Sequence, residues 1–237
     1  MAETTLRAYI EEIGDLIDHN QLDEAVAHCR HILTFYPKSL DAFRLLGKAY
    51  LEQSRHSDAS DILQRVLSAV PDDFVAHVGM GIIREDEGNL DSAIYHMERA
   101  FEVNPANAAI QEELRRLYGR RDGMEPPRIR LTRGALARMY AKGELFPQAV
   151  AELRATLVND PERPDLQVML AEVYWRADQR VEAAETCNEI LTQLPNCRSA
   201  NRILADIWQS SGRAEEADVY KKRLQALDPY EAHANGR

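Results

Sequence analysis

A 34-residue spacing recurs along the chain and limits the possible folds more than any other feature. Prolines mark it in two series, Pro37, Pro71, Pro105 and then Pro127, Pro161, Pro195, Pro229. Alanines keep the same step at Ala25, Ala59, Ala93 and at Ala149, Ala183, Ala217. A unit this short can bury its apolar face only against a neighbour, so the fixed period predicts a stack of similar units.

The unit in residues 39–73 predicts two helices. Its first half places one face of a helix at Phe43, Leu46, Gly47 and Tyr50. After a polar break, its second half repeats the helical spacing at Ala59, Leu63 and Val66 and stops near Pro71. Gly47 and Ala59 are small where the helices should approach closely, and Gly88 and Gly212 fall in turns that tolerate a positive φ. The chain is therefore predicted to be an all-α solenoid.

The same residue types return in later units. They are Leu46-Gly47 with Tyr50, Met80-Gly81 with Ala93, Leu170-Ala171 with Tyr174, and Leu204-Ala205 with Trp208. This pattern resembles the tetratricopeptide repeat family over nearly the whole chain. The resemblance implies a right-handed α-solenoid of about six helix-turn-helix repeats, with a concave groove of first helices that binds proteins.

The repeat fails once, because the step from Pro105 to Pro127 is shorter than the step that separates the other prolines. We expect repeats 1–3 in residues 6–107, an unpaired helix with an Arg/Pro-rich linker in 108–127, and repeats 4–6 in 128–229. Residues 1–5 should be a lead-in and residues 230–237 a polar tail. The unpaired helix is expected to cap the first three repeats at a kink. An unbroken superhelix through a shortened repeat is the alternative.

Composition and motifs disfavour several classes of function. The net charge of −10 disfavours bulk binding of nucleic acid. No apolar run is long enough to span a membrane and no secretory signal opens the sequence, so we expect a cytoplasmic protein. No catalytic, metal or phosphate-binding motif is present, so we expect no enzyme, no cofactor and no metal site. Cys29 and Cys187 fall at core positions, whereas Cys197 falls at a joint and is expected to be exposed.

The resemblance places the binding surface on the first helices, and helical spacing from the core stripe then gives its residues. They are Arg44, Lys48, Leu51, Val75, Val78, Ile82, Arg116, Arg138, Val168, Trp175 and Arg202. The apolar group at Val75, Val78 and Ile82, flanked by basic residues, would suit a peptide with apolar anchors and a carboxylate. Alternatively, the superhelix itself buries Val78 and Ile82.

Basic residues are concentrated in residues 115–142, where nine of them stand against two acidic residues. This basic cluster includes Arg115, Arg120, Arg121, Arg128, Arg130 and Arg133. It would suit an acidic partner segment or the acidic face of a second copy, because arginine binds carboxylates through two parallel hydrogen bonds. Alternatively, these arginines solvate an exposed linker and pair with acidic neighbours.

Together these patterns predict a non-enzymatic protein-interaction scaffold that binds a partner protein or peptide in the groove. Two alternatives stay open. One is a self-associating subunit of a larger assembly. The other is a binder of anions or nucleic acid through the basic cluster, although few aromatic residues interleave the arginines.

Overall fold

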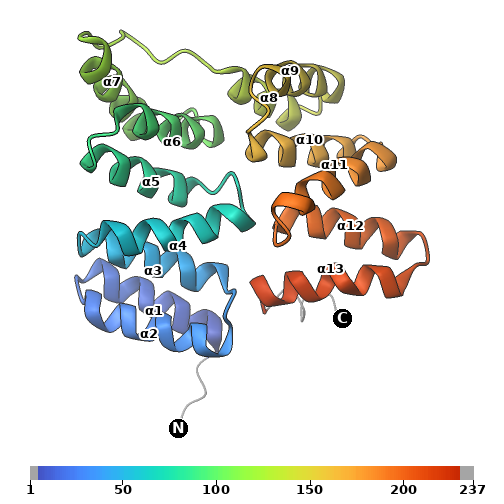
Figure 1. The fold of residues 1–237 in the computed structure, drawn as a ribbon, viewed down its shortest axis with the longest axis horizontal. Coiled ribbons are helices and arrows are strands. Elements are labelled where there is room, and N and C mark those ends of the chain that lie inside the picture. Colours follow the sequence, from blue (N-terminus) through green and yellow to red (C-terminus); the bar gives the residue numbers. More distant parts are fainter. Residues whose placement is uncertain (1–4, 230–237) are drawn as a thin grey trace.

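The computed structural model describes residues 5–229, and within them the chain forms helices joined by short turns and one longer linker (Figure 1). The predicted all-α solenoid is confirmed. The expected tail and nearly all of the lead-in lie outside the described residues. The helices are α1 (Leu6–Asp18), α2 (Leu22–Phe35), α3 (Leu40–Glu52), α4 (His56–Ala69), α5 (Phe74–Asp86), α6 (Leu90–Val103), α7 (Ala108–Asp122), α8 (Arg133–Lys142), α9 (Phe146–Asn159), α10 (Pro164–Arg176), α11 (Arg180–Gln193), α12 (Arg198–Ser210) and α13 (Ala214–Leu227).

A side-chain cap precedes each odd-numbered helix from α1 to α7 and recurs once in each repeat. Thr5, Ser39, Asp73 and Asn107 each precede a helix and accept a hydrogen bond from the backbone N–H three residues further on. Such a cap satisfies one of the backbone N–H groups that the first turn leaves unpaired.

The turns inside each helix pair share one backbone conformation. Six residues in these turns have a positive φ of 57–77°, namely Asn20, Ser54, Gly88, Glu144, Asp178 and Gly212. Within each series they follow the same spacing as the prolines and alanines, so the turn demands the left-handed conformation whatever residue occupies it. The expectation for Gly88 and Gly212 is confirmed.

Small residues lie where the paired helices touch. The six repeated alanines are all fully buried. A Cβ added at Gly47 would lie 2.6 Å from Leu63 Cδ2, and one added at Gly81 would lie 2.8 Å from Met97 Cε. Both contacts are shorter than packed atoms allow, which confirms the predicted close approach of the helices.

The helices form two stacks that lie side by side in Figure 1. We call α1–α7 the first array and α8–α13 the second array. After α7, which packs on α6 and ends at Asp122, the linker of residues 123–132 leads to α8, which also packs against α6. The unbroken superhelix is therefore not the arrangement found, and the return of the second array alongside the first was not predicted.

The two arrays meet at the turns that carry the repeated prolines. Lys38 Nζ donates to Asn196 Oδ1 at 3.1 Å, and Arg138 bonds the carboxylate of Asp72 at 3.0 Å. At one end of this seam, Leu40 and Ala69 of the first array form a small apolar cluster with Leu227 of the second.

Buried charges occupy the middle of the seam. Arg163 donates to Glu102 Oε2 at 2.6 Å and to Asp165 Oδ2 at 2.7 Å, and all three side chains are buried. The Thr132 hydroxyl donates to the other oxygen of Glu102 at 2.7 Å. Burial acts to raise the pKa of Asp165, but the hydrogen bonds and charge of Arg163 outweigh it and leave that pKa below its ordinary value. The seam thus holds paired ions, which are costly to separate inside a protein.

Candidate functional site

Ion pairs link successive odd-numbered helices of the first array. Lys48 of α3 lies 2.7 Å from Asp18 of α1, and Arg44 of α3 lies 2.7 Å from Asp73 at the start of α5. Arg116 of α7 bonds Glu85 of α5 at 2.5 Å, which together with nearby arginines holds the pKa of Glu85 below its ordinary value. The basic residues expected to receive a partner's carboxylate are therefore already paired within the chain.

Apolar side chains are exposed between these ion pairs. Val75 is 47% exposed and Ile82 is 42% exposed, although both belong to α5, whose other face is buried. Val78 lies between them on the same helix and is partly buried against the core around α6 and α7. We call Val75, Val78 and Ile82 the α5 strip. Because Ile82 stays accessible, the alternative that the superhelix buries it is wrong.

The remaining residues predicted for the first-helix surface are not brought together. Leu51 packs partly into the core of the first array. Val168 is only 4% exposed, so it is a core residue and not a surface one. Arg138 lies in the seam with Asp72, because the second array turns back onto the first. Trp175 is partly buried beneath Arg180, and Arg202 lies beside Glu172 at 3.5 Å.

The basic cluster divides into paired and unpaired arginines. Arg115 bonds the Pro126 carbonyl and Glu125, Arg120 bonds Glu85, and Arg121 bonds Asp122. These contacts agree with the alternative interpretation, in which the arginines pair with acidic neighbours in the same chain. Three further members, Arg128, Arg130 and Arg133, are exposed and make no ion pair within the described residues.

The cysteines are all buried within the described residues. The expectation of an exposed Cys197 is wrong, because the second array packs around the start of α12, where this side chain lies. Burial raises the pKa of Cys29 and Cys187 to about 12 and that of Cys197 to about 11, so these thiols are poor nucleophiles. Among residues 5–229, no group of three metal-binding side chains is found, and no helix is long and apolar enough to cross a membrane.

Comparison with known proteins adds two kinds of finding. Family models described as tetratricopeptide repeat match residues 16–78 and 135–196, which together are just over half of the chain. A tetratricopeptide repeat protein from Parabacteroides merdae ATCC 43184 has a similar solved structure, with 13% identity over 94% of this chain and 78% of that chain. The TM-score of this pair is 0.41. The assignment to a family rests on the sequence matches.

Two curated proteins share part of the sequence. Anaphase-promoting complex subunit 7 of Arabidopsis thaliana is 30% identical over 94 residues, which are 40% of this chain and 17% of that protein. An uncharacterized protein of Sinorhizobium fredii (strain NBRC 101917 / NGR234), y4yS, is 33% identical over 85 residues, which are 36% of this chain and 47% of that protein. The matches thus span less than half the length of either relative.

The helix pairs, their fixed period and the two family matches agree with one another. The small residues that the resemblance requires lie at the contacts between helices, and the turns repeat one conformation. The chain belongs to the tetratricopeptide repeat family.

Proposed function

We propose that this chain is a non-enzymatic scaffold that binds a peptide segment of a partner protein on the α5 strip. Tetratricopeptide repeat folds are in general protein-interaction scaffolds, and the first helices are the surface that the family resemblance implies. The observation that supports this choice of site is the exposure of Val75 and Ile82 on a helix whose opposite face is buried. Burying these two side chains would provide apolar binding energy.

The charges beside the strip would set which peptides bind. Arg44 and Arg116 face their own carboxylates at Asp73 and Glu85, so a bound peptide gains little by bringing a carboxylate of its own. We therefore expect the preferred segment to anchor through apolar side chains. The flanking ion pairs would then penalise a misplaced charge and contribute selectivity.

A selection from a peptide library displayed on phage tests this proposal. Peptides enriched on the wild-type chain would be measured against Val75→Asp with Ile82→Asp, which keeps the helix but places charge on the strip. The matched control is Val158→Asp with Val219→Asp, since these valines are 82% and 52% exposed on α9 and α13. We expect binding to be lost only in the strip variant. Equal binding to both variants, or no enriched peptide, would contradict the proposal.

A second candidate function rests on the unpaired arginines of the linker. Arg128, Arg130 and Arg133 are exposed without ion-pair partners in the described part of the chain, and Leu131 between them is 51% exposed. This arrangement favours an acidic partner segment, whose attraction would weaken with salt.

Charge reversal tests this second function. Glu replacements at Arg128, Arg130 and Arg133 would be compared with Glu replacements at Arg115, Arg120 and Arg121, which are already paired. An oligoglutamate peptide and a single-stranded RNA would be the probes. Loss of peptide binding in the first variant alone would support an acidic partner, and binding of RNA alone would favour the nucleic-acid alternative. Concentration-dependent mass in light scattering would instead indicate self-association.

A further inference from the structure

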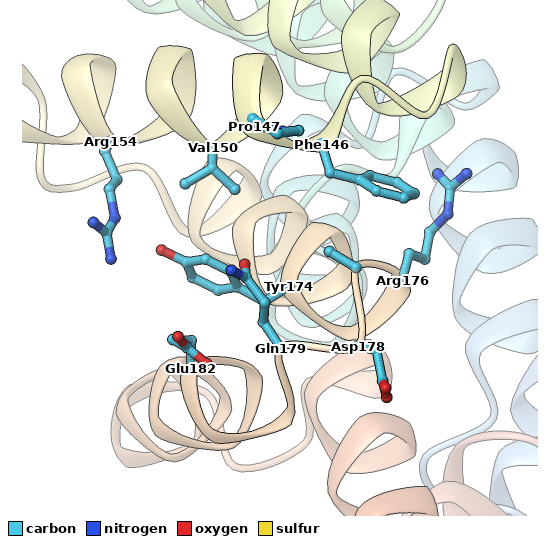
Figure 2. A pocket seen from close by; sticks show the side chains of 10 residues that line it. Phe146, Pro147, Val150, Arg154, Tyr174, Arg176, Asp178, Gln179 and Glu182 are labelled. Carbon is cyan, nitrogen blue, oxygen red and sulfur yellow. The ribbon is translucent and has the colours of Figure 1, made fainter.

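A pocket of about 640 Å³ opens between α9, the end of α10 and the start of α11 (Figure 2). It lies in the second array, away from the α5 strip. Phe146, Pro147 and Val150 of α9 give it an apolar side, and polar groups of α9, α10 and α11 line the rest. A volume of this size falls within the range of about 300–1,000 Å³ that ligand pockets occupy.

Three polar groups converge on the pocket without a protein partner. Tyr174 is 4% exposed, yet its hydroxyl makes no hydrogen bond. In Figure 2 this hydroxyl points into the space between the guanidinium of Arg154 and the carboxylate of Glu182. Arg154 contacts the ring of Tyr174 at 5.7 Å but forms no ion pair within residues 5–229, and neither does the Glu182 carboxylate. A buried hydroxyl without a partner costs free energy, so such a group needs an explanation.

The repeat offers an internal comparison, because position n of the first array corresponds to n+124 in the second. At the corresponding place in the first array, Arg30 donates two hydrogen bonds to the Tyr50 hydroxyl, at 2.8 and 3.2 Å. Tyr174 and Arg154 are the same residue types in the same positions, but the bonds between them are missing. The tyrosine of the first array is thus satisfied by the chain itself, and that of the second is not.

Two further links across the first site are absent from the second. Arg55 stacks on Tyr50 at 4.4 Å and pairs with Asp58 at 2.6 Å, but the corresponding residues are Gln179 and Glu182, which form no pair.

The other link is a hydrogen bond at the rim. Gln53 bonds Asp23 at 2.8 Å in the first array, and Ala177 and Pro147, which cannot form this bond, replace them in the second. Sequence differences at matched positions therefore leave the second site open.

We propose that this pocket binds a second peptide segment, separate from the one on the α5 strip, through a backbone amide and an adjacent apolar side chain. The amide oxygen accepts from Arg154 and the Tyr174 hydroxyl, and the amide N–H donates to Glu182. The apolar side chain packs on Phe146 and Val150.

Charge balance selects a neutral amide over an ion. Arg154 and Arg176 on the lining are balanced by Asp178 and Glu182. Two of these charges already have partners, because Arg176 donates to the Ala141 carbonyl at 2.8 Å and Asp178 accepts from Arg180 at 2.8 Å. Apart from the Gln179 carboxamide, the free groups on the lining are one cation, one anion and one hydroxyl, which match the acceptor and the donor of a peptide bond.

Titration of the full chain with N-acetyl-leucine methylamide, followed by ¹⁵N NMR, tests the proposal. This probe is neutral and carries two amides and one apolar side chain. We expect saturable shifts confined to residues 146–154 and 174–182, with a dissociation constant on the order of 1 mM for a ligand of this size. N-acetyl-leucine and leucine methylamide, which carry a negative and a positive charge, should bind more weakly. No saturable shift, or tighter binding of either charged probe, would overturn the proposal.

Two variants separate binding from folding. Tyr174→Phe removes only the hydroxyl and should weaken the probe about fivefold, while Tyr50→Phe in the closed site should leave probe binding unchanged. Thermal unfolding should show the reverse pattern, since only Tyr50→Phe deprives an arginine of its hydrogen-bond partner. Equal loss of stability in both variants would mean that Tyr174 has a protein partner in solution and would overturn the proposal.

A closure variant gives an independent check. Gln179→Arg restores the residue type of Arg55 and should fill the pocket by pairing with Glu182, which abolishes binding while the fold is kept. Probe binding that persists in this variant would contradict the site. The variant Val75→Asp with Ile82→Asp should retain probe binding, so failure of the α5 strip and failure of the pocket are distinguishable.

Discussion

Single residues in this chain are constrained most strongly at the turns inside the helix pairs. The turn position requires a positive φ, which costs a residue with a Cβ about 1–2 kcal/mol relative to glycine. Gly88 and Gly212 avoid this cost, whereas Asn20, Ser54, Glu144 and Asp178 do not. All six residues occupy the same place in the repeat, so glycine and non-glycine residues can be compared at one turn position within a single chain.

The substitution Ser54→Gly should therefore stabilise the protein. Ser54 has a φ of 57° and its side chain makes no hydrogen bond within the described residues, so nothing is lost on its removal. We expect the free energy of unfolding to rise by about 1 kcal/mol in urea denaturation. The reciprocal change, Gly88→Ser, should lower it by a similar amount. A rise in stability for both variants would contradict the assignment of the turn.

A pair of histidines makes stability depend on pH. Burial lowers the pKa of His96 to about 3, with the charges of His77, Arg84 and Arg99 acting in the same direction. Burial also lowers the pKa of His77, although its hydrogen bond to the Pro71 carbonyl opposes the change. Their ring nitrogens lie 3.0 Å apart, so one of the two must accept a hydrogen bond and stay neutral.

Acidification from pH 7 to pH 5 should accordingly destabilise the fold. Both histidines have a lower pKa folded than unfolded, so their stabilisation is complete above the unfolded value of about 6.5 and is lost as the pH falls. Each contributes a slope of at most about 1.4 kcal/mol per pH unit. Urea denaturation at several pH values gives the free energy of unfolding as a function of pH. This free energy should depend less steeply on pH in His96→Asn, whereas the exposed His31→Asn should match the wild type. An unchanged slope in His96→Asn would exclude the pair as the cause.

Close packing between the two helices of a pair leaves little room at their contact. Gly47 leaves no room for a side chain because Leu63 occupies the space that its Cβ would take. Gly14 of α1 is different, since a Cβ there would meet nothing within 4 Å, and the neighbouring Ile13 is fully buried. Two helical glycines of adjacent repeats thus serve different purposes.

These two glycines should respond oppositely to substitution. Gly47→Leu forces α3 and α4 apart and should cost about 1–3 kcal/mol, with a lower melting temperature. Gly14→Ala should stabilise α1 by roughly 0.5–1 kcal/mol, because alanine favours a helix over glycine. A melting temperature that Gly47→Leu does not lower would show that the helix register is wrong.

Sequence patterns predicted the helix pairs because each pair is determined by local spacing. Residue size predicts the close helix contacts at Gly47 and Ala59, and the backbone freedom of glycine predicts the turn at Gly88. The structure agrees at all three positions. Contacts between distant segments leave no such pattern. Glu102 and Arg163 are 61 residues apart, and neither differs in type from the many charged residues of the surface.

In the candidate sites, too, features determined by local spacing were predicted, and those determined by contacts between distant segments were not. Val75 and Ile82 were predicted to line the first-helix surface, and the structure leaves both exposed. Arg138 was assigned to that surface by the same spacing, but the return of the second array turns it into a seam residue. The unpaired Tyr174 was not predicted, although comparison of Arg55 with Gln179 at matched repeat positions could have indicated it.

The seam joins the two arrays into one body. Its central contact is the pair of Arg163 and Glu102, whose side chains are 4% and 2% exposed. Most other ion pairs named above lie at the surface and contribute little. Removing one member of a buried pair leaves the other without compensation, which is much more costly.

The substitution Arg163→Met should thus cost roughly 3–5 kcal/mol, because it leaves Asp165 buried without its paired cation and leaves Glu102 with only Arg99, at 3.2 Å. Arg180→Met is the matched control, since Arg180 pairs with Asp178 at the surface and should cost at most about 1 kcal/mol. Thermal unfolding monitored by circular dichroism compares the two. Similar melting temperatures for both variants would contradict a structural role for the seam.

The chain folds back at the linker, so that its two arrays lie side by side. Small-angle X-ray scattering of the wild-type protein as a monomer tests it most directly. We predict a pair-distance distribution with a single compact maximum and a largest dimension that agrees with the arrangement in Figure 1. A distribution with a long tail, as expected for one extended stack running through α7 and α8, would contradict it.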